Sequence, residues 1–401
     1  MSELPFLPYG RQSVDEDDIA AVAEALKADF LTTGPMVGRF EEAFAKAVSA
    51  KHAVSCNSGT AGLHLATLAL GLGPGDLAIV PTLTFLATAN AVRYVGAEVV
   101  FADVDSETGL LTAAGLTAAL GRAKAMPGKV KAALPVHLKG VPVDLPALGE
   151  IAAAHDFVLV EDAAHAIGTT YGGGGKVGDN RHSRMTVFST HPVKTMTSGE
   201  GGVVTTEDPE LARALKRFRS HGMEADPARW QMPEQGMEDG AAAPWFYEMA
   251  EFGYNYRLPD INCALGLSQL AKLDRFIARR AELVALYDSL LAPLSNLVRP
   301  PKRPADSRPG WHLYAVQIDF PAAGVTRAEL MRKLRADGIG TQVHYVPVHR
   351  QPYYQKRYGA LNLPGAEAFY RGTLSLPLYP ALRDDDVRRV VERLAHHLNV
   401  S

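Results

Sequence analysis

This sequence has few cysteines, a small net charge and no long apolar runs. The two cysteines, Cys56 and Cys263, stand far apart, so we expect no disulfide framework and a reducing compartment, the cytoplasm. A net charge of −3 over 401 residues gives no electrostatic reason to expect nucleic acid or an anionic membrane as a partner. No apolar run reaches transmembrane length, and the opening residues MSELPFLPYGRQS lack the basic and apolar regions of a signal peptide.

Apolar residues make up 47% of the chain, enough for a large core and a second, smaller domain. Between about residues 52 and 210, short runs rich in β-branched residues alternate with helical stretches. The runs are HAVSC (52–56), AIVP (78–81), VVFADV (99–104), KAALPVH (131–137), FVLVED (157–162), TVF (186–188) and VVTT (203–206). The helical stretches between them lie at 59–70, 86–95, 111–120 and 144–155. This alternation is typical of an α/β protein with a mainly parallel sheet covered on both faces.

The segments that flank this region predict further elements. Ser13-Val14-Asp15-Glu16 matches a capping box, so a helix is expected to begin near Ser13. Residues 222–250 carry Gly, Pro, acids and isolated aromatics, which favours an exposed excursion over packed structure. One long helix is expected from Pro259 to about Leu291.

The chain is expected to divide once. The proline-rich stretch at 299–310 marks a junction, and the runs beyond it suggest a small α+β domain. We therefore predict a large domain at 1–257, which includes an N-terminal arm. A linking helix and the small C-terminal domain would occupy 258–401.

Residues 186–206, TVFSTHPVKTMTSGEGGVVTT, place a lysine between two β-branched runs. Lys194 follows the first run, and the glycine-rich turn 198–202 leads into the second. This arrangement can hold an amine rigidly at the edge of a sheet, where a lowered pKa would let it form a Schiff base with an aldehyde. The local pattern alone leaves open a surface lysine in a hairpin.

Two motifs near the first apolar runs are candidates for ligand contacts. Ser58-Gly59-Thr60 stands before a helical stretch, where backbone N–H groups can bind a phosphate; an ordinary helix N-cap is the alternative. Phe85 follows the next run, and it could lie against a flat heterocycle or fill the core.

A third motif follows the run FVLVED, which ends in Glu161 and Asp162 and is followed by His165. The carboxyl end of a parallel strand is where ligand crevices open in α/β sheets. A buried carboxylate there could pair with a protonated ring nitrogen, or it could serve only as a helix N-cap.

Together these features supply what pyridoxal 5′-phosphate (PLP) requires: a phosphate site, a ring-stacking aromatic, an acid for the pyridinium nitrogen and an amine for the aldehyde. Their order resembles that of the fold-type I aminotransferases that act on nucleotide sugars, the DegT/DnrJ/EryC1/StrS family. The resemblance is carried by LTTGP, NSGTAGL, PTLTFLATANAV, VEDAAHAIGTTYGG, FSTHPVKTMTSGEGG, GYNYRLPDINCALGLSQL and PVHRQPYY. It implies PLP as cofactor, no metal, and a homodimer with shared active sites.

The resemblance also implies roles for single residues. Lys194 would carry the Schiff base and move a proton between the cofactor and the substrate carbon. Asp162 would keep the pyridine nitrogen protonated, Phe85 would stack on the ring, and His165 would lie near the phenolic oxygen. The phosphate contacts would come from Ser58, Gly59, Thr60, Ser189 and, across the dimer, Asn255 of the partner subunit.

Within the family, the runs PYGRQSVDEDD, HPVK, FRSHGM and TQVHYVPVH are most similar to the branch that makes pseudaminic acid. That branch aminates C4 of a UDP-linked 4-keto-6-deoxy-N-acetyl-hexosamine. The alternative is the same chemistry on another nucleotide 4-keto sugar, dTDP- or GDP-linked. Segments that match substrate contacts of the branch contain Tyr9, Phe30, Leu31, Thr32, Gln342, His344 and Tyr345.

The implied reaction is a ping-pong transamination in which glutamate gives its amino group and leaves as 2-oxoglutarate. A non-catalytic, cofactor-binding regulator is the rival from another class, but the chain keeps Lys194 and Asp162 and has no DNA-binding domain. A sugar dehydratase would need histidine in place of the lysine, and His191 is expected to be structural or to support residues that contact the ligands. The segment between His221 and Gly253 is expected to cover the active-site mouth or the dimer seam.

Overall fold

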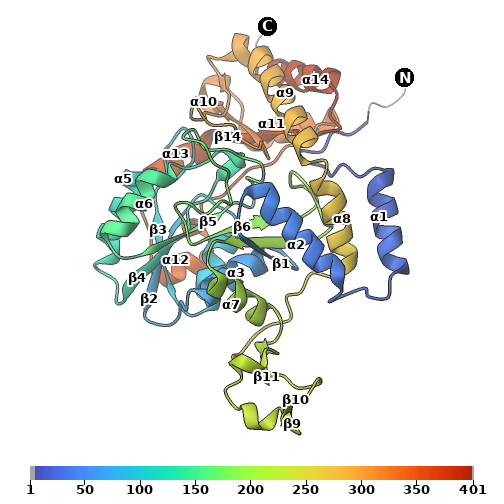
Figure 1. Cartoon of the computed structure of the whole chain (residues 1–401). Coiled ribbons are helices and arrows are strands. Elements are labelled where there is room, and N and C mark those ends of the chain that lie inside the picture. The colour runs from blue at the N-terminus through green and yellow to red at the C-terminus, as the bar shows by residue number, and fades with distance from the viewer. Residues whose placement is uncertain (1–4, 400–401) are drawn as a thin grey trace.

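A seven-stranded sheet forms the centre of the computed structural model, which describes residues 5–399 (Figure 1). Its strand order is β1-β7-β6-β5-β4-β2-β3. The strands are β1 (His52–Cys56), β2 (Asp76–Pro81), β3 (Glu98–Ala102), β4 (Lys129–Ala133), β5 (Val158–Asp162), β6 (Met185–Ser189) and β7 (Gly202–Thr206). Strand β7 is antiparallel to β1 and β6, and the remaining neighbours are parallel. The predicted α/β class and mainly parallel sheet are confirmed.

The helices that pack against this sheet include α2 (Pro35–Val48), α3 (Gly59–Ala69), α4 (Leu86–Tyr94), α5 (Ala113–Ala123), α6 (Leu145–Ala154) and α7 (Pro209–Arg219). Their cover explains why the strands are apolar along nearly their whole length, since both faces are removed from water. The chain passes from a buried strand to a helix at the carboxyl ends of β1 and β2, and to a loop at the carboxyl end of β5, so polar residues at these ends gather at one edge.

The first helix begins later than predicted. Helix α1 (Glu16–Lys27) has Asp15 as its N-cap, and the capping box is completed by Asp18 instead of involving Ser13. The carboxylate of Asp18 is buried and also accepts a hydrogen bond from Gln269, whose amide donates to the Ser13 carbonyl as well. These long-range contacts decide where the helix starts.

The long helix predicted from Pro259 to Leu291 is two helices, α8 (Asp260–Leu270) and α9 (Leu273–Leu291). The single-helix prediction is wrong because the axis changes at Ala271 and Lys272, where the Lys272 ammonium turns to the Asp18 carboxylate at 2.9 Å. The break lets α8 pack against α1 and α2 while α9 packs against the last helix, α14 (Asp384–His397).

The C-terminal part contains a three-stranded antiparallel sheet, β12 (Val298–Arg299), β13 (Tyr314–Ile318) and β14 (Thr373–Leu376). Its other helices are α10 (Phe320–Ala323), α11 (Arg327–Ala336), α12 (Pro352–Tyr358) and α13 (Pro364–Gly372). One hydrophobic cluster extends from Val204 in the large sheet to Val316 in the small one. The division at residue 257 therefore stays a prediction. Across residues 5–399, no helix combines the length and apolar character needed to cross a membrane.

Residues 222–250 project from the body of the protein, below the large sheet in Figure 1. The segment is mostly exposed, as predicted, but it contains packed structure, which corrects the expectation of an unpacked excursion. Two short antiparallel pairs form it, β8 (Met223–Glu224) with β11 (Glu248–Met249) and β9 (Met237–Glu238) with β10 (Ala241–Ala242). Trp230 is buried against Phe246, with the ring centroids 4.7 Å apart.

Candidate active site

A cavity of about 670 Å³ opens at the carboxyl ends of the parallel strands. It contains all but one of the residues predicted to bind the cofactor: Ser58, Gly59, Thr60, Phe85, Asp162, His165, Ser189 and Lys194. Four of the predicted substrate residues also line it: Tyr9, Gln342, His344 and Tyr345. Residues more than 300 positions apart in the sequence thus line the same cavity.

Lys194 lies in the turn after β6, and its side chain is partly buried. Its backbone N–H donates to the His191 carbonyl at 2.9 Å, which closes the turn. Burial lowers the pKa of the Lys194 amine to about 8, against the opposing attraction of Asp162. An amine with this pKa is partly neutral near physiological pH, so it can act as a nucleophile or a base.

The glycine-rich turn after Lys194 is required by close packing. A Cβ on Gly201 would lie 2.4 Å from the hydroxyls of Ser198 and Thr190, which hydrogen-bond each other at 2.6 Å. Gly199 has a φ of +83°, a conformation that side chains rarely adopt. The glycines therefore let β7 return beside β6 directly behind the lysine.

Asp162 is the last residue of β5, and its side chain enters the cavity. One carboxylate oxygen accepts a hydrogen bond from the Thr88 hydroxyl at 2.6 Å, and the other accepts from the Ala164 N–H at 3.1 Å. Burial raises the pKa of Asp162, and the Thr88 hydrogen bond opposes that rise. The two hydrogen bonds fix the orientation of the carboxylate, which can pair with a cationic group bound in the cavity.

The N-terminus of α3 forms a cradle suited to a phosphate. Ser58 caps the helix by accepting from the Ala61 N–H at 3.1 Å, so the N-cap interpretation is correct for its side chain. Gly59 faces Ser189 so closely that an added Cβ would lie 2.9 Å from the serine Cβ. The free N–H groups and positive end of a helix dipole fit a phosphate, so the residues present fit the phosphate group of PLP.

Phe85 is not a core residue. It is the N-cap of α4, and 55% of its side chain is exposed. Its ring centroid lies 5.9 Å from that of Tyr345 across the cavity wall. The alternative of a core aromatic is therefore wrong, and the ring is available to a flat ligand.

His165 is buried and held from two sides. Its Nδ1 accepts the Lys139 backbone N–H at 3.3 Å, so the neutral ring carries its proton on Nε2, which lies 3.2 Å from the Tyr345 hydroxyl. Burial, followed by the charge of Lys194, holds the pKa of His165 well below its ordinary value. The ring is thus neutral, and its centroid lies 4.4 Å from that of the His312 ring, which is tilted against it.

Four predicted residues lie outside this cavity. Asn255 is exposed and pairs with Ser220 in an isolated bridge, and Phe30, Leu31 and Thr32 form an exposed loop after α1. Their roles stay predictions, and the role of Asn255 involves a second subunit. None of residues 222–250 lines the cavity, so the projecting segment does not cover the mouth within its own chain.

The structure adds residues that the sequence did not suggest. The clearest are Thr88, whose hydroxyl donates to Asp162, and Glu200, which lines the cavity. His191, expected to be structural or supporting, lines the cavity itself and lies 3.8 Å from the Glu200 carboxylate.

A helix-capped phosphate cradle, a buried carboxylate and an amine of lowered pKa on this fold define an enzyme of the PLP-dependent class. The chain belongs to the DegT/DnrJ/EryC1/StrS aminotransferase family, whose model matches residues 12–395. It is therefore a PLP-dependent nucleotide-sugar aminotransferase.

Three known proteins illustrate the similarity. The spore coat polysaccharide biosynthesis protein SpsC of Bacillus subtilis (strain 168) is 41% identical over 392 residues, 96% of either chain. Helicobacter pylori PseC, an aminotransferase involved in the biosynthesis of pseudoaminic acid, is 28% identical with a TM-score of 0.86, covering 98% of this chain and 99% of PseC. DesI, solved in the presence of its TDP-sugar product, is 29% identical with a TM-score of 0.84, covering 99% of this chain and 94% of DesI.

Proposed function

We propose that this enzyme moves the amino group of glutamate to C4 of a UDP-4-keto-6-deoxy-N-acetyl-hexosamine, as in pseudaminic acid biosynthesis. The observation that carries the proposal is the similarity of almost the whole chain to PseC. The motifs HPVK and TQVHYVPVH support it, because both contribute to the cavity wall, through His191, Lys194, Gln342 and His344.

Each cavity residue is assigned one task. The N-terminus of α3 and Ser189 would bind the cofactor phosphate, Phe85 would lie on its ring, and Asp162 would face its ring nitrogen. When bound, PLP supplies an aldehyde that condenses with amines and a ring that withdraws electrons from the reacting carbon. Lys194 would attach the cofactor at rest, and its freed amine would then move the proton at the substrate carbon, which its pKa of about 8 allows.

His165 and Tyr345 would control the environment of this proton transfer. Since His165 is neutral and donates from Nε2, it can donate to an oxygen without adding charge. Burial raises the pKa of Tyr345, so its hydroxyl also stays protonated. These two groups would orient the oxygen atoms of the bound molecules and leave Lys194 as the single base.

A homodimer completes the proposal. Among residues 5–399, Lys194 is the one lysine or arginine that lines the cavity, which also holds Asp162 and Glu200. A nucleotide diphosphate and glutamate each carry at least two negative charges, so further positive or neutral donors are needed. Asn255 of the partner subunit would add a donor at the mouth. We place the enzyme in the cytoplasm, where nucleotide sugars are made.

The alternative substrate is a different nucleotide 4-keto sugar. Two observations favour it: the identity to SpsC, 41%, exceeds that to PseC, 28%, and DesI was solved with a TDP-sugar. The same PLP chemistry would serve, because the reacting carbon is a ketone in every case.

A panel of keto-sugar nucleotides separates these substrates. The purified enzyme is incubated with glutamate and UDP-, dTDP- or GDP-linked 4-keto sugars, and the amino sugar product is quantified by mass spectrometry. The proposal predicts the highest kcat/KM for the UDP-linked N-acetyl sugar. A higher kcat/KM for a dTDP- or GDP-linked sugar would replace it with the alternative.

A further inference from the structure

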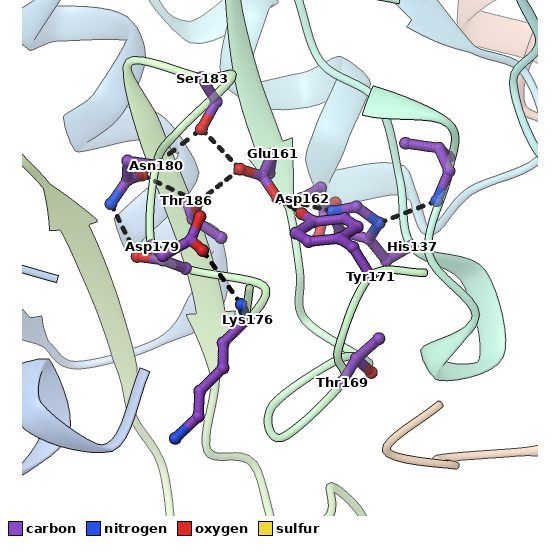
Figure 2. Close-up of polar contacts among 12 residues, drawn as sticks. His137, Glu161, Asp162, Thr169, Tyr171, Lys176, Asp179, Asn180, Ser183 and Thr186 are labelled. Carbon is purple, nitrogen blue, oxygen red and sulfur yellow. Dashed lines mark hydrogen bonds and ion pairs between the residues drawn. The ribbon is translucent and has the colours of Figure 1, made fainter. Parts of the chain in front are cut away.

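Glu161, next to Asp162 on β5, is a buried carboxylate that takes no part in the reaction proposed above. Only 2% of it is exposed. One oxygen accepts from Ser183 at 2.5 Å and from Thr186 at 2.9 Å. The other accepts from Tyr171 at 2.5 Å and bonds to His137 Nε2 at 2.8 Å. Figure 2 shows Ser183 and Thr186 on one side of Glu161 and Tyr171 with His137 on the other.

The hydrogen bonds keep this buried carboxylate charged. Burial by itself would raise the pKa of Glu161, but the bonds from His137, Ser183 and Tyr171 hold the pKa below its ordinary value. His137 Nδ1 accepts the Val143 N–H at 3.2 Å, so Nε2 carries a proton and donates to Glu161. Successive side chains of a strand point to opposite faces, which puts this network behind the sheet and Asp162 in front of it.

The backbone around His137 reaches Asp162. The His137 N–H donates to the Asp162 carbonyl at 3.1 Å, and the Asp162 N–H donates to the Pro135 carbonyl at 2.8 Å. Val136, which lies between Pro135 and His137 in the sequence, lines the cavity. The segment 135–137 is therefore hydrogen-bonded to the end of β5 on both sides of the catalytic carboxylate.

The same segment continues to His165. Lys139, two residues beyond His137, donates its backbone N–H to His165 Nδ1 and so fixes the neutral form of that ring. Lys139 has a φ of +68°, and its buried ammonium is bound to the Thr108 carbonyl. A non-glycine residue in this conformation must be held by its surroundings, and the His137–Glu161 hydrogen bond lies at the near end of the turn.

We propose that the buried Glu161–His137 pair is a positioning device that holds segment 136–139, and through it aligns Asp162 and His165 on the bound cofactor. The proposal rests on the roles given above to Asp162 and His165, and it is independent of which sugar is the substrate. Glu161 and His137 touch neither cofactor nor sugar; they act through the backbone that connects them to the cavity.

The test compares two variants with a matched control in the PLP-loaded enzyme. Glu161→Gln removes the negative charge at nearly constant shape. Its amide N–H₂ faces either His137 and Tyr171, which breaks the pair, or the hydroxyls of Ser183 and Thr186, which leaves His137 only a neutral acceptor and so weakens the pair. His137→Asn keeps an acceptor for the Val143 N–H but is too short to reach Glu161. Ser183→Ala is the control. It removes the hydroxyl that donates to the other oxygen of the same carboxylate, and it leaves the His137 contact intact.

Three quantities are measured: the melting temperature, the visible circular dichroism of bound PLP, and the rate of its absorbance change with excess glutamate, which needs no sugar. All three variants should melt lower. Glu161→Gln and His137→Asn should also lose circular dichroism and slow the glutamate reaction about tenfold or more, with Ser183→Ala within about twofold of the parent.

The decisive outcome is the contrast between the pair and the control. If the two pair variants lower only the melting temperature, in step with Ser183→Ala, the network is merely structural and the proposal is wrong. Should Glu161→Gln fail to fold, His137→Asn decides alone, because it leaves three donors on Glu161 and so strands no buried charge. The sugar panel reports on the substrate, so failure of one proposal is distinguishable from failure of the other.

Discussion

Thr88→Val removes one hydroxyl from the active site at nearly constant shape. Thr88 is buried in α4, and its hydroxyl donates to the Asp162 carboxylate at 2.6 Å. The Ala164 N–H would be the only other hydrogen bond to that carboxylate from the described residues. We expect lower activity, because a less firmly held and less readily ionised Asp162 stabilises the protonated ring nitrogen poorly.

The size of the effect follows from the type of bond. A hydrogen bond to a charged group contributes about 1.5–3 kcal/mol, and each 1.36 kcal/mol is a factor of about ten, so kcat/KM should fall about 10- to 150-fold. The sign with pH is fixed as well. Burial has already raised the pKa of Asp162, and losing the opposing hydrogen bond raises that pKa further. The loss should therefore be greatest at low pH and smaller as the pH rises.

The assay is the single-turnover reaction of the PLP-loaded variant with glutamate, followed by visible absorbance from pH 6 to 9. Thr88→Ser keeps the hydroxyl and should restore most of the rate. Thr84→Val removes the 2.7 Å partner of Thr88 but leaves the Asp162 bond, so its loss should be smaller. A Thr88→Val rate within twofold of the parent at every pH, with PLP bound, would refute the role assigned to this hydrogen bond.

Three further predictions concern the cofactor. Lys194→Ala should still bind PLP through the phosphate cradle and Asp162, as measured by equilibrium dialysis, yet show no product; normal turnover would exclude the lysine as the base. Mixing apoenzyme with PLP should give a coloured adduct at a rate that rises with pH and levels off above about 8, the pKa of Lys194; an inflection near 10.5 would contradict its burial effect. Gly59→Ala should raise the Kd for PLP about tenfold, because its Cβ would meet Ser189 at 2.9 Å, whereas Gly38→Ala, with open space around it, should leave the Kd unchanged.

Local pattern was sufficient to predict the sheet and much of the cavity. Every apolar run contains a strand because such runs are stable only where both faces are covered, and helices of matching length lie between them. The ends of these strands then bring Ser58, Phe85, Asp162 and Ser189 to one edge. Their nearness follows from parallel topology and needs no knowledge of long-range contacts.

Thr88 and the contacts that were not predicted depend on long-range packing alone. Thr88 lies 74 positions from Asp162, and the Tyr345–His165 contact spans 180 positions. A threonine within a helix, or a tyrosine in a loop, carries no local sign of its distant partner. The position of the first helix and the break before Leu273 have the same origin, since both are set by the buried carboxylate of Asp18.

Glu161 and Asp162 show most directly what sequence leaves undecided. The two acids are adjacent on one strand, both are buried, and either could be assigned to the ligand from the sequence. Four side chains donate to Glu161, and three of them, His137, Ser183 and Tyr171, hold its pKa down against burial. Asp162 receives one hydroxyl and one N–H, and burial raises its pKa. The first carboxylate is therefore satisfied by the protein, while the second still gains from a cation. That unmet requirement, more than its place in a motif, is why we assign Asp162 to the cofactor and Glu161 to the wall behind it.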